Sequence, residues 1–197
     1  KSIENGVDGL RINPGNIGGH DKVREVIQKA KERNIKIRIG VNGGSLEKEI
    51  VHLYGKGADA MVQSAMSHVK ILEDLDFYNT VVSLKSSDIF KTIEAYTKFA
   101  QMTDYPLHLG ITESGTTKKG TIKSSIGIGH MLLGGIGDTV RVSLTADPVE
   151  EIYVAKEILS ALELQRDRIR IVSCPTCART KINLIELAER IEEKTKN

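Results

Sequence analysis

The chain has 197 residues, of which 40% are hydrophobic and 27% charged, and its 28 basic and 26 acidic side chains leave a formal net charge of +2. This composition is typical of a folded domain with a sizeable core and excludes a disordered, collagenous or disulfide-stapled chain. The near balance of charge argues against a domain-wide surface for nucleic acid or an anionic membrane, so any anion site must be local. No apolar run is long enough to span a bilayer and the first residues are not a signal peptide, so we expect a cytoplasmic protein.

Short apolar segments alternate along the chain with amphipathic stretches, which predicts β-α units and a parallel sheet. The amphipathic stretches place apolar residues three and four positions apart, as helices with one buried stripe do. The clearest helix is Asp147–Ala161, because Asp147 is followed by Pro148 at the first helical position and by two glutamates. In chain order the predicted strands are Gly9–Asn13, Lys36–Val41, Thr80–Leu84, Pro106–Ile111, Asp138–Leu144 and Ile169–Val172, and a last helix is predicted over Lys181–Lys194.

The strand ends favour one of the two folds that such units build. A doubly wound sheet concentrates its chemistry at one glycine-rich turn, whereas a β/α barrel gathers polar residues from the carboxyl ends of many strands. Nearly every predicted strand ends in polar side chains, which favours the barrel. A barrel has eight strands and typically about 250 residues, so these units alone are too few to close one.

Basic side chains recur on one side of the predicted strands, because side chains alternate across a strand. The residues that share this side are, strand by strand, Arg11 with Asn13, Arg38 with Asn42, Ser83 with Lys85, and Arg141 with Ser143. Cations on the inner face of hydrophobic strands are costly to bury unless an anion meets them. Four such cations converging would form a pocket for a phosphate ligand of two or more negative charges. The alternative is that each pairs with an Asp or Glu at a strand end.

A histidine and a glutamate flank another strand end. His108 lies in the predicted strand Pro106–Ile111, and Glu113 follows it with opposite parity, so that it must reach a site through the loop. In a phosphate-binding site a carboxylate is better suited to handling a proton than to binding the anion. The alternative is a solvated loop acid beside neighbouring lysines.

The two cysteines form a C-x-x-C pair, Cys174 and Cys177. This spacing is typical of a metal or redox site rather than of a structural disulfide in a cytosolic protein. Structural zinc sites and iron–sulfur clusters use about four ligands, and the surroundings of a thioredoxin-like dithiol are absent. We therefore expect further ligands outside the chain.

Together, these segments resemble the 4-hydroxy-3-methylbut-2-enyl diphosphate synthase family, which acts in the methylerythritol phosphate route to isoprenoids. The resemblance runs in order along essentially the whole chain, in LRINPGNIG (10–18), IRIGVNGGSLE (37–47), PLHLGITE (106–113), GDTVRVSL (137–144) and CPTC (174–177). It implies a homodimer of two-domain subunits. Each subunit has a β/α barrel followed by an iron–sulfur domain, whose 4Fe-4S cluster is held by three cysteines and one glutamate.

The reaction that the resemblance implies is the two-electron reductive ring opening and dehydration of 2-C-methyl-D-erythritol 2,4-cyclodiphosphate. Flavodoxin or ferredoxin supplies the electrons. By the same resemblance, Glu113 is the acid near the substrate hydroxyls, and Cys174 and Cys177 are the first two cluster ligands. The implied substrate contacts are Arg11, Asn13, Arg38, Asn42, Lys85, His108, Arg141 and Ser143.

The resemblance also implies that the chain is a fragment. The strand with Arg11 corresponds to the fourth barrel strand, so residues 1–172 are expected to form about the last five strands of a TIM-type (β/α)8 barrel. Residues 173–197 are then the beginning of the cluster domain. We expect that the 197-residue chain alone neither assembles the cluster nor turns over substrate.

Two other functions fit parts of the sequence. One is a Schiff-base aldolase of a phosphorylated sugar with Lys85 as the nucleophile, although four cations exceed what one phosphate needs. The other is a non-catalytic module in which the C-x-x-C pair binds structural zinc. Borohydride trapping would support the first, and one zinc without iron per full-length chain would support the second.

Overall fold

The computed structural model describes residues 1–12, 20–165 and 169–195. The chain divides into two compact units, Lys1–Ala155 and Lys156–Asn197. Across the described ranges, no helix is both long and apolar enough to cross a membrane.

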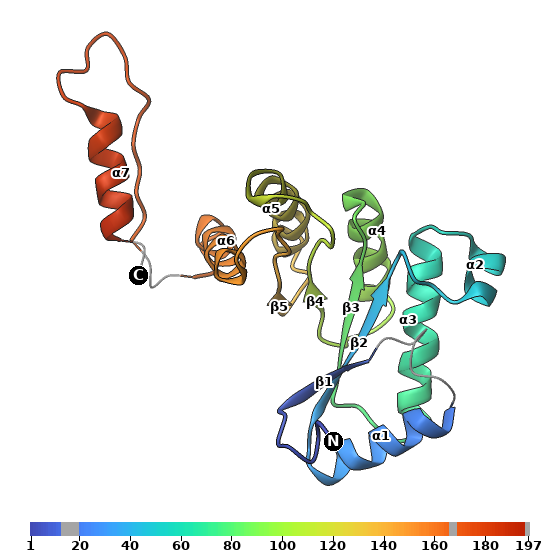
Figure 1. The fold of residues 1–197 in the computed structure, drawn as a ribbon. Coiled ribbons are helices and arrows are strands. Elements are labelled where there is room, and N and C mark those ends of the chain that lie inside the picture. The colour runs from blue at the N-terminus through green and yellow to red at the C-terminus, as the bar shows by residue number, and fades with distance from the viewer. Residues whose placement is uncertain (13–19, 166–168, 196–197) are drawn as a thin grey trace. The chain divides into compact units, whose positions relative to one another are not determined.

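The first unit alternates strands and helices, as the sequence pattern predicts (Figure 1). Its strands are β1 (Gly9–Ile12), β2 (Lys36–Asn42), β3 (Thr80–Lys85), β4 (His108–Leu109) and β5 (Thr139–Val140). Its helices are α1 (His20–Glu32), α2 (Lys48–Tyr54), α3 (Ala58–Glu73), α4 (Ile89–Ala100), α5 (Thr117–Leu133) and the first part of α6 (Pro148–Ala161). The helix predicted over Asp147–Ala161 is thus confirmed.

All strand pairs are parallel, and their order follows the chain. β2 lies between β1 and β3, and β4 pairs with β5. A parallel bridge between Val82 and Leu107 connects β3 to β4. This sequential order is that of a β/α barrel, whereas a doubly wound sheet reverses its strand order. The strands of the described residues do not close into a barrel.

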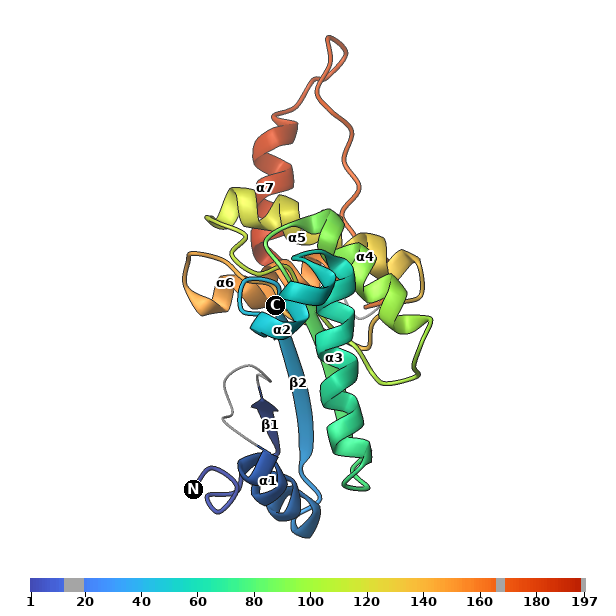
Figure 2. The same ribbon diagram turned by 90° about the vertical axis from the view of Figure 1, so that its right-hand side faces the viewer.

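One face of the sheet is apolar and covered by helices. Ile37, Ile39, Val82 and Leu84 are fully buried on this face. Helix α3 packs against β2 and β3, and α4 packs against β3. Figures 1 and 2 show both helices along the same side of these strands. Because side chains alternate across a strand, the basic residues of β2 and β3 lie on the opposite face.

Glycines within α5 and between α5 and β5 allow close packing. A Cβ added at Gly127 would lie 2.6 Å from Cδ1 of Ile111, and a Cβ at Gly137 would collide with Leu109. Gly137 also has φ +116°, a conformation that favours glycine. Gly134 is the C-cap of α5. Gly127 and Gly137 thus allow close packing, and Gly134 ends the helix.

Strands β4 and β5 are shorter than the predicted segments Pro106–Ile111 and Asp138–Leu144. Beyond the regular ladder, the backbone N–H of Arg141 still donates to the carbonyl of Leu109 at 3.0 Å. A single backbone hydrogen bond thus continues the pairing where the strand ends. The segment after β5 therefore depends on other contacts for its position.

The second unit contains α7 (Leu184–Lys194), which begins three residues later than predicted. Asn183 sets this start, because its side chain accepts a hydrogen bond from the N–H of Glu186 and caps the helix. The predicted strand Ile169–Val172 is wrong. These residues have no regular secondary structure, and Ile169 and Val172 are 69% and 83% exposed. A strand must pair with a neighbour, and none of the described segments pairs with them.

Candidate functional site

Four basic side chains gather at the sheet face opposite α3 and α4. We call Arg11, Arg38, Lys85 and Arg141 the cation cluster. The strand register sets Arg11 opposite Arg38 and Lys85 opposite Asn42, and Arg141 directly follows β5. The positive charges of all three guanidinium groups lower the pKa of Lys85. The structure thus brings the four predicted cations together.

Two glycines make room for the cation cluster. At Gly40 the Arg11 guanidinium occupies the space in which a Cβ would stand, and its Nη2 donates to the Gly40 carbonyl at 3.3 Å. At Gly110 a Cβ would lie 2.9 Å from Nζ of Lys85 and 2.6 Å from the carbonyl oxygen of Arg141. A larger residue at either glycine would displace a cation.

The cluster changes the acidity of its own members. Burial is the main reason why the pKa of Lys85 falls from 10.5 to about 7, and the neighbouring guanidinium groups add to the effect. Burial and the charges of Arg11 and Arg141 also lower the pKa of Arg38, which remains charged. The Lys85 amine is therefore close to half protonated at neutral pH.

His108 borders the cluster as a neutral group. Burial first, and the charge of Lys85 second, lower the pKa of His108 to about 3. Its Nδ1 lies 2.8 Å from Oγ1 of Thr139, whereas its Nε2 is buried without a hydrogen-bond partner among the described residues. Nε of Arg38 is buried and unpartnered in the same way. Buried polar atoms are normally paired, so these two nitrogens offer contacts to a ligand.

Carboxylates do not neutralise the cluster. In the part of the chain that the structure describes, Arg141 alone of the four has an ion-pair partner, with its Nε 3.7 Å from Oε2 of Glu151. The alternative of separate structural ion pairs therefore applies to Arg141 and not to the described surroundings of Arg11, Arg38 or Lys85. Basic side chains arranged in this way suit an anionic ligand.

The other predicted site residues differ in their surroundings. Oδ1 of Asn42 accepts the N–H of Gly44 at 2.9 Å, which leaves its Nδ2 to donate. Ser143 is partly buried just beyond Arg141. Glu113 is exposed, has φ 53° and makes no hydrogen bond or ion pair within the described ranges. The predicted contact Asn13 lies outside the described residues.

The loop after β2 is fastened to α3. Oε2 of Glu47 accepts a hydrogen bond from Oγ of Ser64 at 2.8 Å, and Oε1 lies 3.1 Å from Nε2 of His68. These contacts connect the loop that begins at Asn42 to a packed helix.

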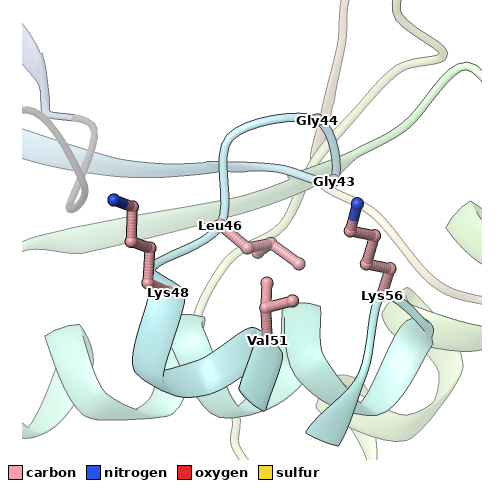
Figure 3. Close-up of a pocket in the computed structure, with 6 residues that line it drawn as sticks. All are labelled: Gly43, Gly44, Leu46, Lys48, Val51 and Lys56. Carbon is pink, nitrogen blue, oxygen red and sulfur yellow. The ribbon is translucent and has the colours of Figure 1, made fainter.

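A shallow pocket lies beside this loop (Figure 3). The side chains of Leu46 and Val51 point toward each other in it, and the lysine side chains stand on either side. Its lining residues are Gly43, Gly44, Leu46, Lys48, Val51 and Lys56. No member of the cation cluster lines the pocket, so we assign the candidate site to the cluster.

Cys174 and Cys177 are exposed free thiols in the second unit. Hydrogen bonds from the backbone of Arg179 and from the side chain of Thr180 lower the pKa of Cys177, which favours the thiolate that binds metals. Within the described ranges, no three His, Cys, Asp or Glu side chains gather in a way that could hold a metal ion. The pair therefore offers two ligands.

We expect the thermal stability of the full-length protein to depend on pH through Lys85. Between pH 7 and 10.5 the unfolded chain holds a proton on Lys85 that the folded protein has released, so unfolding becomes harder as pH rises. The gain is at most about 1.4 kcal/mol per pH unit. The melting temperature of the wild type should rise between pH 7 and pH 9.5 relative to Lys85→Met. A constant difference between the two proteins would contradict the lowered pKa.

Comparison with known proteins gives the context of this geometry. Residues 1–156 match the model of the GcpE TIM-barrel domain. The chain belongs to the GcpE family. Similar GcpE proteins are named 4-hydroxy-3-methylbut-2-en-1-yl diphosphate synthase (flavodoxin). The chain spans about half the length of these curated relatives.

Three of these relatives illustrate the similarity. The protein of Fusobacterium nucleatum is 59% identical over 194 residues, which cover 98% of this chain and 55% of that protein. Those of Clostridium perfringens and Geobacter sulfurreducens are 58% and 57% identical over 195 residues, again 98% of this chain, and 56% and 55% of those proteins. The resemblance to this family seen in the sequence is thus confirmed.

Sequence reasoning missed several residues that shape this GcpE site. Gly40 and Gly110 were visible as glycines inside predicted strands, a pattern that marks a close approach of other groups. Glu151 stands in the first turn of α6, where an acidic residue is already explained by the helix dipole. Its contact with Arg141 becomes visible only in three dimensions.

Proposed function

We propose that this chain carries the substrate-binding part of an enzyme that opens and dehydrates 2-C-methyl-D-erythritol 2,4-cyclodiphosphate to 4-hydroxy-3-methylbut-2-enyl diphosphate. Residues 1–172 would be the last five or so strands of a (β/α)8 barrel, and 173–197 the beginning of an iron–sulfur domain. The observation that carries the proposal is the cation cluster, which lacks a balancing set of carboxylates. The names of the GcpE relatives, which state a diphosphate product, support a diphosphate ligand.

A cyclic diphosphate suits this cluster by charge and by hydrogen-bonding geometry. Arginines bind phosphate oxygens through paired N–H donors, and the Lys85 ammonium acts as a point charge among them. Binding an anion favours the protonated amine, so the substrate itself raises the pKa of Lys85 and strengthens its own contact. The orphan Nε of Arg38 gains a partner in the same step.

Neutral groups would orient the sugar part of the substrate. Nδ2 of Asn42 is available to donate, and the hydroxyl of Ser143 can donate or accept. His108, held neutral, can hydrogen-bond a substrate oxygen without adding charge. Asn13, which follows Ile12 in the sequence, would complete this set of neutral hydrogen-bonding groups.

Glu113 would hold the proton that a departing hydroxyl needs. From its loop position after β4, this carboxylate would reach the substrate without standing among the phosphate contacts. Its left-handed backbone is costly for a non-glycine residue, and such conformations recur at functional sites.

Cys174 and Cys177 fit the donor set of a 4Fe-4S cluster as two of its ligands, because both thiols are exposed and hydrogen bonds favour the thiolate of Cys177. When bound, such a cluster supplies the electrons for the reduction. Flavodoxin or ferredoxin would deliver them, and a homodimer would bring the cluster domain to the barrel. The names of the relatives include flavodoxin, which supports the first donor.

The test uses the full-length protein, reconstituted anaerobically with iron and sulfide. We expect it to bind the cyclodiphosphate and to convert it to the allylic diphosphate with reduced flavodoxin. Cys174→Ser should lose cluster absorbance while retaining substrate binding, which calorimetry measures. A wild-type protein that neither binds nor converts the cyclodiphosphate would overturn the proposal.

One observation favours a second candidate. An amine with a pKa of about 7 is suited to attack a carbonyl, as the lysine of a Schiff-base aldolase does. Borohydride reduction in the presence of a phosphorylated aldose or ketose would then leave a stable adduct on Lys85, detectable by peptide mass. An unmodified Lys85 excludes this candidate.

A further inference from the structure

Glu151 is the carboxylate that reaches the cation cluster within the described part of the chain. It stands in the first turn of α6, and its side chain is 18% exposed. Its Oε1 accepts the backbone N–H of Leu144 at 2.9 Å, and its Oε2 lies 3.7 Å from Nε of Arg141. One side chain therefore contacts both the backbone and the guanidinium of the segment that follows β5.

This segment needs such an anchor because β5 ends at Val140. Residues 141–144 have no regular secondary structure, although they contain the proposed substrate contacts Arg141 and Ser143. The backbone N–H of Arg141 bonds to Leu109, and the next backbone anchor is the N–H of Thr145, bonded to Gly115 at 2.9 Å. Between these two points, the bond to Glu151 fixes the backbone at Leu144.

The position of a carboxylate here is otherwise unfavourable. The cluster would bind an anion, and a nearby negative charge works against that binding. The helix dipole does not require Glu151, because the adjacent Glu150 also places a negative charge in the first turn. Glu150 is exposed, and its side chain makes no hydrogen bond or ion pair within the described ranges. The distinctive property of Glu151 is the reach of its oxygen to Leu144.

We propose that Glu151 is a positioning residue, whose side-chain oxygen holds the backbone at Leu144 and thereby places Arg141 and Ser143 for the diphosphate. This inference rests on the proposed function of the cluster. The carboxylate oxygen, carried two methylenes from the backbone, performs this role, and the negative charge is incidental to it.

Two conservative substitutions separate length from charge. Glu151→Gln keeps an accepting oxygen at the same reach without the charge, and Glu151→Asp keeps the charge on a side chain one methylene shorter. Glu150→Gln and Glu150→Asp are matched controls in the same helical turn. Binding of the cyclodiphosphate to the full-length protein is measured by calorimetry, KM and kcat are measured separately, and thermal unfolding confirms that each variant is folded.

We expect Glu151→Gln to bind within about threefold of the wild type and Glu151→Asp to bind about tenfold more weakly, because the hydrogen bond to Leu144 is lost. The loss should raise KM more than it lowers kcat, and both Glu150 variants should match the wild type. If the Asp variant binds normally, or if the Gln variant is as weak as the Asp variant, the inference is overturned. If the wild type itself does not bind the cyclodiphosphate, the proposed function fails first and the inference with it.

Discussion

Replacing Lys85 by methionine is expected to weaken binding of the cyclodiphosphate about 10- to 150-fold, because a hydrogen bond to a charged group contributes about 1.5–3 kcal/mol. The same substitution should raise the melting temperature of the full-length protein at pH 7. Methionine has a similar length but carries no charge, so it removes the cost of burying a charge and, second to it, the repulsion from the guanidinium groups, which together lower the pKa of Lys85. A residue that weakens the fold while it binds ligand is characteristic of a functional site.

Calorimetric titration and thermal unfolding measure the two effects on the same samples. Lys56→Met is the matched control, since it makes the same substitution at a lysine that lines the pocket of Figure 3 and lies outside the cation cluster. It should change neither quantity appreciably. Equal loss of affinity in both variants would mean that general positive charge, rather than this cluster, attracts the ligand.

Gly110→Ala is expected to destabilise the protein by about 1–3 kcal/mol, as overpacking of a core does, and to abolish most substrate binding. The new methyl group would lie 2.6 Å from the carbonyl oxygen of Arg141. This oxygen belongs to the backbone, which cannot move aside as the end of a flexible side chain can. It would also press on Nζ of Lys85, 2.9 Å away. Both neighbours belong to the cation cluster, so stability and binding should fall together.

Gly129→Ala provides the control for this substitution. Gly129 is buried within α5, and nothing lies within 4 Å of an added Cβ. Alanine is favoured over glycine in a helix by about 0.8–1.0 kcal/mol, so this variant should unfold at a higher temperature with unchanged binding. If the Gly110→Ala variant has the melting temperature and the substrate affinity of the wild type, then β4 and the Arg141 segment are farther apart than in this structure.

The alternation of side chains made the binding face predictable. Successive side chains of a strand point to opposite faces of the sheet, so the position of Arg38 and of Lys85 in its strand decides which face it occupies. This position can be read from the local sequence once the strand is recognised. The parallel order followed in the same way from alternating strands and helices. These features depend on residues close together in the chain.

Features set by distant contacts were not predictable. Ile169–Val172 has the apolar composition of a strand, but a strand forms only with a partner, and none of the described segments supplies one. The approach of Gly110 to Arg141, and of Glu151 to Leu144, depends on how closely neighbouring elements of the first unit pack. Sequence spacing contains no record of such distances.

The unpartnered nitrogens of Arg38 and His108 have a consequence for the protein in the cell. In the proposed enzyme, the substrate would be the counter-ion that completes the folded state. By linkage, a ligand that binds only the native form stabilises it by about 2.7 kcal/mol at a hundred times its dissociation constant. The amount of enzyme that escapes degradation would then rise when the cyclodiphosphate accumulates, so that supply of the substrate would regulate the lifetime of its own catalyst.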